Sequence, residues 1–296
     1  MQLSVSNKKI ISIVGARPQF IKAAAVSKHI RKYIKEILVH TGQHYDENMS
    51  TIFFDDMEIP RPDCNLNAGS GSHGYQTARI IELVEKVLTR ERPSAVLVYG
   101  DTNTTLGGAI AAVKLMIPVF HVEAGLRSGN MKMPEEINRI LTDQCSDLLF
   151  CPTENSVQNA MAEGIQNGVH LTGDVMYDAA LFYKNKSEKN STIMDSLNLK
   201  SGTYFLCTVH RAENTDNQAH MESIVETLVA LEAPVVFPLH PGTRKALTEY
   251  KMLDQLRKAD NLIIIDPVGY LDMIKLENSA KKILTDSGGV QKEAYF

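Results

Sequence analysis

The four cysteines of this 296-residue chain form no CxxC pair. Closely spaced cysteines are the usual sign of a disulfide framework or a zinc site, so we expect reduced thiols and a cytoplasmic protein. The N-terminal apolar run 10–14 is too short for the core of a signal peptide, and no apolar run approaches the roughly 18 residues that a membrane span requires. We therefore expect no membrane association.

An excess of charge of either sign is also missing. The chain has 31 Lys and Arg against 35 Asp and Glu, which gives a net charge of −4. Such a balance provides no general attraction for nucleic acid, so we expect no nucleic-acid partner. An anionic small molecule would need a local basic site.

Motifs of common nucleotide and metal enzymes are scarce. GxxxxGK[ST] does not occur, and GxGxxG matches once, at 69–74, in a loop that does not follow a predicted strand, which argues against a P-loop kinase and a dinucleotide fingerprint. The histidines and carboxylates show no HExxH or similarly tight spacing, so we expect no catalytic metal and no cofactor. Acid–base chemistry remains.

The chain does contain a repeated alternation of strands and helices. The apolar runs 95–99 and 117–122 have the length and β-branched content of buried parallel strands, and an Ala/Gly-rich helix lies between them. Similar strands are expected at 9–14, 36–40, 147–151, 169–173, 204–209, 235–239, 262–265 and 282–285. The chain is longer than a domain with a single hydrophobic core usually is, so we expect two domains. We predict an α/β protein with two Rossmann-like, doubly wound domains, 1–180 and 181–296, joined near the polar surface stretch 185–191.

Carboxylates follow two neighbouring predicted strands. Asp101 follows the first and Glu123 the second, and the pair Glu135 and Glu136 begins a predicted helix. Ligands of open parallel sheets bind beyond the carboxyl ends of the strands. Asp101, Glu123, Glu135 and His210, which follows a strand of the second half, could therefore remove and return protons. Taken singly, each carboxylate could instead cap a helix or form a loop ion pair.

Two glycine-containing turns are candidate anion sites. One is 15–18, where Arg17 and the later Lys22 could contact a phosphate, and the other is 287–289. Each could also be an ordinary turn between a strand and a helix.

Two further features of the chain stand apart from these turns. His44 is either a ligand contact or a loop histidine. The chain stops at Phe296, inside the last predicted helix, so we expect the second domain to be truncated there.

Seven motifs spread over nearly the whole chain suggest a family. They are GARPQFIK at 15–22, TGQH at 41–44, GDTNTTL at 100–106, HVEAGLRS at 121–128, MPEEINR at 133–139, HRAEN at 210–214 and TDSGGVQKEA at 285–294. In this order they resemble the non-hydrolysing UDP-N-acetylglucosamine 2-epimerases. The resemblance implies two Rossmann-like domains in a GT-B arrangement and a homodimer.

The resemblance also implies a reaction. UDP-N-acetylglucosamine loses its C2 proton and its UDP by anti elimination, and re-addition of UDP to the 2-acetamidoglucal, with protonation on the opposite face, gives UDP-N-acetylmannosamine. No nicotinamide or metal is consumed. The UDP-sugar is the expected partner.

Site residues follow from the matching motifs. Asp101, Glu123 and Glu135 match the catalytic carboxylates of the family, and His210 matches its catalytic histidine. The candidate substrate contacts are Arg17, Lys22, His44, Arg211, Ser287, Gly288, Gly289 and Glu293. Among them, Arg17 and residues 287–289 match diphosphate contacts, and Glu293 matches a ribose-binding carboxylate.

Several alternatives stay open. The segments 15–28, 98–106 and 266–274 look especially like the branch that acts on UDP-2,3-diacetamido-2,3-dideoxyglucuronate. Gln76 lacks the adjacent arginine with which many bacterial members bind an activating second UDP-N-acetylglucosamine. A GT-B glycosyltransferase would share the cleft but need an acceptor, a hydrolysing epimerase would release free sugar, and an inactive module would only bind the UDP-sugar.

Overall fold

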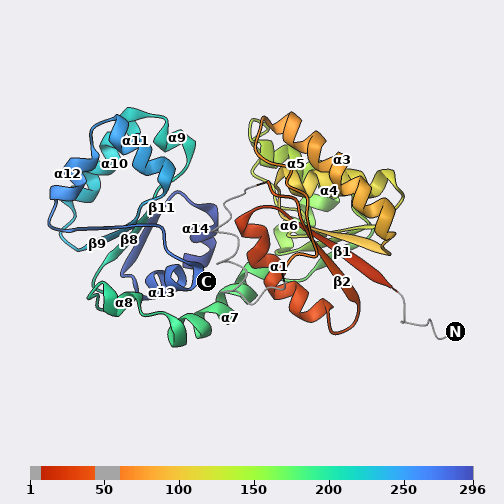
Figure 1. Ribbon diagram of the computed structural model, residues 1–296, viewed down its shortest axis with the longest axis horizontal. Coiled ribbons are helices and arrows are strands. Elements are labelled where there is room, and N and C mark those ends of the chain that lie inside the picture. The colour runs from red at the N-terminus through yellow and green to blue at the C-terminus, as the bar shows by residue number, and fades with distance from the viewer. Residues whose placement is uncertain (1–7, 44–60, 296) are drawn as a thin grey trace. The chain divides into compact units, whose positions relative to one another are not determined.

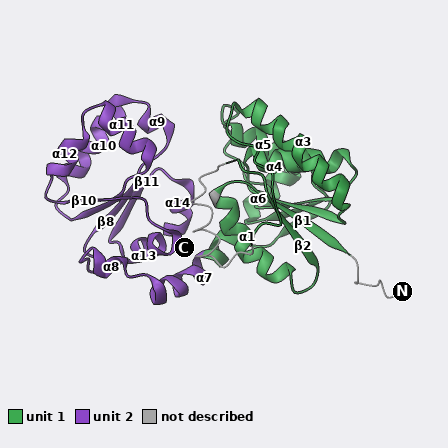
Figure 2. Ribbon diagram, in the orientation of Figure 1, with its two compact units in different colours: residues 1–179 green, residues 180–296 purple. Residues whose placement is uncertain are grey.

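The computed structural model describes residues 8–43 and 61–295 (Figure 1). The chain forms two compact units, residues 1–179 and 180–296, coloured separately in Figure 2. Each unit contains one parallel sheet with helices between successive strands. The predicted α/β class with two Rossmann-like folds is confirmed.

Unit 1 is built on a seven-stranded parallel sheet with the order β3-β2-β1-β4-β5-β6-β7. Its strands are β1 (Lys9–Val14), β2 (Lys35–His40), β3 (Cys64–Asn65), β4 (Ala95–Tyr99), β5 (Val119–Val122), β6 (Leu148–Cys151) and β7 (Val169–Leu171). Its helices are α1 (Arg17–Ile30), α3 (His73–Glu91), α4 (Asn103–Lys114), α5 (Pro134–Cys145) and α6 (Glu154–Ala162). The strand order reverses direction between β1 and β4, and ligands of such sheets bind at this switch point.

Unit 2 has a four-stranded parallel sheet with the order β10-β9-β8-β11. Its strands are β8 (Phe205–Thr208), β9 (Val235–Pro238), β10 (Leu262–Ile265) and β11 (Lys282–Thr285). Its helices are α8 (Ile193–Ser196), α9 (Ala212–Thr215), α10 (Gln218–Ala230), α11 (Pro241–Glu249), α12 (Leu253–Lys258), α13 (Tyr270–Ser279) and α14 (Gly288–Tyr295). The order is that of the first four strands of unit 1, so its switch point lies between β8 and β11.

Close packing of α4 against its neighbours explains the Ala/Gly-rich sequence of that helix. Figure 1 shows α3, α4 and α5 on one face of the unit 1 sheet and α1 on the other. A Cβ atom at Gly107 would lie 2.7 Å from Ile80 of α3, and one at Gly108 would lie 3.0 Å from Ile13 of β1. Since real Cβ contacts are longer, only glycine allows this helix to approach both the sheet and α3 so closely.

A separate buried polar cluster lies between β1, α1 and β2. The Glu36 carboxylate accepts hydrogen bonds from the hydroxyls of Ser12 and Ser27, at 2.5 and 2.8 Å, and from Arg31 Nε at 2.7 Å. The Glu36 side chain is fully buried. We call this group the Glu36 cluster; its hydrogen bonds satisfy a carboxylate that would otherwise be costly to bury.

The prediction of a surface connection at 185–191 is wrong for most of that stretch. Helix α7 (Val175–Asn190) continues through it and crosses the boundary between the two units. Ser187 is buried and its hydroxyl donates to the carbonyl oxygen of Leu271 at 2.6 Å, while Glu188 pairs with Lys275. These contacts with α13 stabilise helical turns whose composition alone favours a loop.

No helix within residues 8–43 and 61–295 has both the length and the hydropathy needed to cross a membrane.

Candidate functional site

The carboxyl end of the unit 1 sheet brings several turns together, which we call the unit 1 rim (15–17, 99–105 and 122–125). Gln19 of α1 connects two of them. Its side-chain oxygen accepts from the backbone N–H groups of Gly15 and Ala16, at 2.8 and 3.1 Å, and its amide donates to the Tyr99 carbonyl at 2.8 Å. Gln19 is buried, so the glycine turn after β1 is fixed to the end of β4.

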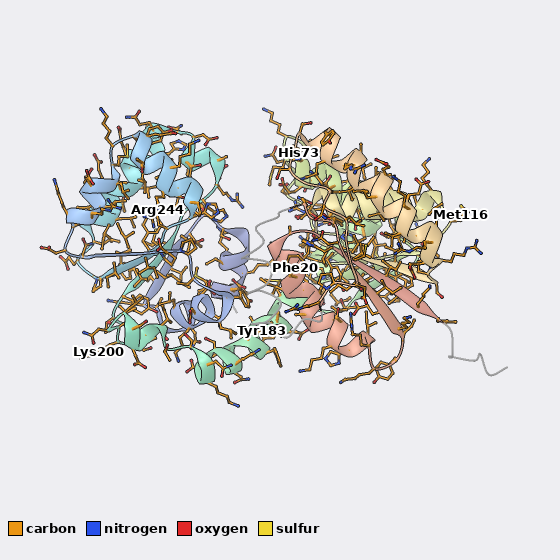
Figure 3. All side chains as sticks on the ribbon, viewed as in Figure 1. Phe20, His73, Met116, Tyr183, Lys200 and Arg244 are labelled. Carbon is orange, nitrogen blue, oxygen red and sulfur yellow. The ribbon has the colours of Figure 1, made fainter. Side chains whose placement is uncertain are left out.

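A second set of side-chain amides fixes the turn after β4 to α3 and α5. Asn138 of α5 donates to the backbone carbonyl of Asp101 at 2.9 Å, and Asn103 donates to Gln76 Oε1 at 2.8 Å. Asn103 also lies 3.2 Å from Nδ1 of His73, which Figure 3 labels at the start of α3. Gln76 in turn donates to the Gly69 carbonyl at 2.9 Å. Buried hydrogen bonds therefore fix the conformation of the unit 1 rim.

Asp101 lies at the rim with one oxygen bound to a cation. Its Oδ2 accepts from Nη2 and Nε of Arg139, at 2.6 and 3.0 Å, and its side chain is 31% exposed. A carboxylate that is paired yet partly accessible can reach a ligand while its orientation is fixed. Arg139 was not among the predicted site residues.

The two glutamates that begin α5 occupy different environments. Glu136 is buried and accepts from the backbone N–H groups of Ser128 and Gly129, at 2.9 and 2.8 Å, and from Arg139 Nη1 at 2.8 Å. Glu135 is partly exposed and makes no hydrogen bond or ion pair within the described ranges. Glu136 is thus a structural anchor, and Glu135 is the glutamate that remains available to a ligand.

Glu136 should make the folding stability depend on acid pH. Burial opposes its ionisation, but the N–H groups of Ser128 and Gly129 and the Arg139 guanidinium outweigh this effect and lower its pKa to about 2. A depressed pKa stabilises the fold above the ordinary pKa of a glutamate, and this stability is lost as the pH falls toward 2. Glu136→Gln should therefore cost about 2 kcal/mol at pH 7 and progressively less below pH 4.

Urea unfolding of both proteins between pH 7 and pH 3 measures this difference. The exposed Glu85→Gln variant of α3 serves as a control and should follow the wild-type curve. A constant offset between Glu136→Gln and wild type at every pH would contradict the assignment.

Glu123 follows β5 in a left-handed conformation, with φ of 69°. Its carboxylate forms an ion pair with Lys22 of α1, and both side chains are more than nine-tenths buried. Figure 3 labels Phe20 on the same helix. A Cβ atom at Gly100 would lie 2.9 Å from Lys22 Nζ and 3.3 Å from Glu123 Oε2. A side chain at position 100 would crowd the ion pair, and the positive φ of Gly100, 64°, also favours glycine. Lys22, predicted as a phosphate contact, is bound to a predicted catalytic carboxylate.

In unit 2, Asp286 organises the turn after β8. Its carboxylate accepts from the backbone N–H groups of His210, at 3.1 Å, and Arg211, at 3.0 Å, and from the Asn214 amide at 2.9 Å. Burial opposes ionisation of Asp286, but these donors outweigh it and hold its pKa below the usual range. His210 Nδ1 lies 3.4 Å from Asp286 Oδ1, so this ring nitrogen faces the carboxylate and Nε2 is directed elsewhere.

The first turn of α14, which begins with Gly288 and Gly289, lies beside Arg211. A Cβ atom at Gly288 would be 3.6 Å from Arg211 Nη2, and the Ser287 hydroxyl accepts from the Val290 N–H at 3.4 Å. Arg211 is 43% exposed. The guanidinium and the start of α14, with Gly289 next to it, are suited to bind an anion such as a diphosphate.

Glu293, predicted to bind a ribose, accepts a hydrogen bond from the buried Tyr270 hydroxyl at 2.7 Å. His44 lies outside the described residues, as does the side chain of Arg17. Within the described ranges, no three His, Cys, Asp or Glu side chains are grouped in a way that would hold a metal ion.

Two residues that sequence reasoning missed, Arg139 and Asp143, lie on α5. Asp143 is buried, and Arg139 donates to the buried Glu136 of the same helix. Residues 136, 139 and 143 are spaced by three and four, which is the spacing of one helical face. A charged helical face of this kind, next to strand-end carboxylates, is the signal that would have found them.

Comparison with known proteins identifies one family. Residues 28–296 match the family model described as UDP-N-acetylglucosamine 2-epimerase. A UDP-N-acetylglucosamine 2-epimerase homolog of Methanococcus maripaludis is 56% identical over 97% of this chain and 81% of its own length. The UDP-2,3-diacetamido-2,3-dideoxy-D-glucuronate 2-epimerase of Pseudomonas aeruginosa is 51% identical over 97% of this chain and 80% of its own.

A solved structure is similar as well. The crystal structure of the Methanocaldococcus jannaschii UDP-GlcNAc 2-epimerase, in complex with UDP-GlcNAc and UDP, matches with a TM-score of 0.89 and 46% identity, over 97% of this chain and 81% of that one. The resemblance expected from the seven motifs is confirmed. The chain belongs to the UDP-N-acetylglucosamine 2-epimerase family.

Proposed function

We propose that this protein is an isomerase that inverts C2 of a UDP-N-acetylated sugar and converts UDP-N-acetylglucosamine to UDP-N-acetylmannosamine. Removal of the C2 proton and cleavage of the C1–O bond to UDP give 2-acetamidoglucal with a C1=C2 double bond. UDP then adds back at C1, and a proton is delivered to the opposite face of C2. Family membership supports this reaction.

The observation that carries the proposal is the pair of carboxylates at the ends of two adjacent strands. Asp101 follows β4 and Glu123 follows β5, and each is fixed by a cation, Arg139 or Lys22. Two carboxylates in different surroundings, one partly exposed and one nearly buried, are suited to proton removal and return. We propose that these two and Glu135 are the catalytic carboxylates.

Unit 2 contributes the leaving-group chemistry in this proposal. UDP leaves with negative charge on its diphosphate, and positively charged or N–H donors that bind this charge lower the barrier. Arg211 and residues 287–289 supply such donors, as does Arg17 of unit 1 in this proposal, while His210 acts on the same substrate through Nε2. Lys22 and His44 are proposed substrate contacts, and Glu293 a ribose contact.

Proton NMR in deuterium oxide tests the reaction. With UDP-N-acetylglucosamine as substrate, the C2 proton signal should disappear from both substrate and product as UDP-N-acetylmannosamine accumulates. Free N-acetylmannosamine with UDP would indicate a hydrolysing enzyme instead. A C2 signal of full intensity in both sugars would refute the proposal.

A second substrate has an observation in its favour. The Pseudomonas aeruginosa relative, 51% identical, is named for UDP-2,3-diacetamido-2,3-dideoxy-D-glucuronate. The same NMR experiment with this sugar, run beside UDP-N-acetylglucosamine, compares kcat/KM for the two substrates. Deuterium exchange with the uronate alone would move the assignment to that branch.

We further propose a cytoplasmic homodimer with domains 1–180 and 181–296. The compact units 1–179 and 180–296 support this division of the chain. Sedimentation equilibrium measures the oligomeric state, and a mass equal to one chain at micromolar concentration would contradict the dimer.

A further inference from the structure

A buried histidine lies between the turns that carry Asp101 and Glu123. His121 of β5 is fully buried. Its Nδ1 is 2.6 Å from Asp143 Oδ1, and its Nε2 is 2.7 Å from the backbone carbonyl oxygen of Gly100. A carboxylate and a carbonyl are both acceptors, so both ring nitrogens donate. The imidazole is therefore fixed at both ends.

The carboxylate that holds this ring is also fully buried. Asp143 Oδ2 accepts from the Gly125 N–H at 3.0 Å and lies 2.8 Å from Arg127 Nη1. Burial opposes ionisation of Asp143, but His121 and Arg127 outweigh it and keep its pKa below the usual range. Through its two oxygens, Asp143 is thus bound to β5 and to the turn that follows β5.

Both turns contain left-handed residues, and one of these residues is strained. Gly100, Glu123 and Gly125 all have positive φ, at 64°, 69° and 75°. Glu123 is not a glycine, so its conformation is strained and persists only because the surroundings hold it. Gly125 cannot be replaced without strain, since a Cβ atom there would lie 2.2 Å from the carbonyl oxygen of Ser156.

We propose that His121, held by Asp143, is a positioning residue that fixes the turns of Asp101 and Glu123 in their reactive geometry. It binds the Gly100 carbonyl, one residue before Asp101, while Asp143 binds the Gly125 N–H, two residues after Glu123. His121 contacts no substrate in this role. The role rests on the proposed function, because Asp101 and Glu123 are its proposed catalytic carboxylates.

Two substitutions test the hydrogen bonds of the two ring nitrogens of His121 one at a time. The amide of asparagine can replace Nδ1, so His121→Asn keeps the donor to Asp143 and loses the one to Gly100. The longer glutamine replaces Nε2, so His121→Gln keeps the donor to Gly100 and loses the one to Asp143. We expect His121→Asn to lower kcat by about 10- to 100-fold with KM changed by less than about threefold.

The ranking of the two variants by kcat and by Tm distinguishes a positioning role of His121 from a role in folding stability alone. His121→Gln leaves the buried Asp143 with one donor fewer and should have the lower Tm, yet it should retain the higher kcat because the Gly100 contact is kept. Ser27→Ala is the matched control, since it removes a hydrogen bond from the Glu36 cluster, which is also buried in unit 1. It should lower Tm and leave kcat unchanged. Loss of kcat that follows Tm across all three variants would overturn the proposal.

Amide hydrogen exchange tests the positioning without any activity. In His121→Asn, exchange should become faster at residues 100–102 and remain as in wild type at residues 10–14 of β1. Unchanged exchange at 100–102 would overturn the positioning role even in an active enzyme. Failure of wild type to label C2 with deuterium would instead refute the proposed function, so the two failures are distinguishable.

Discussion

Asp101→Asn is expected to lower kcat by about 10²- to 10⁴-fold, the range over which a positioned acid or base contributes. Asparagine has the shape of aspartate, and its side-chain oxygen can still accept from Arg139, which binds Asp101 Oδ2 at 2.6 Å. The rim should therefore keep its structure while the group loses its ability to take up a proton. The C2 deuterium exchange of substrate should fall together with product formation.

Asp147→Asn is the matched control for this variant. Asp147 accepts a hydrogen bond from the Val119 N–H at 2.9 Å. Val119 begins β5, so this contact lies at the amino ends of the strands, opposite the unit 1 rim. Its replacement removes a comparable carboxylate from unit 1 and should leave kcat within about threefold of wild type. If Asp101→Asn exchanged the C2 proton for deuterium at the wild-type rate, with an unchanged Tm, Asp101 would have no role in proton transfer.

His210→Asn is expected to lower kcat by about 10²- to 10³-fold. The asparagine amide can keep the contact that Nδ1 makes with Asp286, at 3.4 Å, but it has no equivalent of Nε2. The backbone N–H of residue 210 would still bind the Asp286 carboxylate, so the turn after β8 should stay folded. Steady-state kinetics, with UDP affinity measured by calorimetry, tests whether the loss lies in kcat rather than in nucleotide binding.

His220→Asn supplies the comparison. His220 also uses Nδ1 for a local contact, 3.0 Å from the Glu213 carbonyl oxygen, and it is exposed. Its replacement should change neither kcat nor UDP affinity. Equal kinetic losses in His210→Asn and His220→Asn would show that unit 2 was merely perturbed.

The sequence predicts the sheets of this protein well because buried parallel strands have a local signature. The runs at 9–14 and 95–99 are predominantly apolar segments bounded by polar turns, and they form β1 and β4 as expected. Strand ends are equally local, which is why Asp101 and Glu123 could be placed at the carboxyl edge. The helical end of α7 was missed because its stability comes from contacts with α13, more than 80 residues away in sequence.

The partners of the site residues could not be predicted, since they are set by tertiary packing. Nothing local distinguishes Glu135 from Glu136, yet only Glu136 is buried and bound to Arg139. Lys22 was assigned to a phosphate on the strength of its charge, while its ion pair with Glu123 depends on how α1 meets the end of β5. The buried His121 was overlooked because a histidine within an apolar strand carries no spacing signal.

The identical strand order of β3-β2-β1-β4 and β10-β9-β8-β11 gives the two halves equivalent positions at the ends of their strands. Asp101 and Asp286 follow the fourth strand of that order in their respective halves and are architectural counterparts. The Asp101 carboxylate is partly exposed beside Arg139. The Asp286 carboxylate instead accepts hydrogen bonds from the backbone N–H groups of His210 and Arg211. The same position of the architecture thus holds an accessible carboxylate in one half and a carboxylate bound by its own backbone in the other, because the neighbouring residues differ.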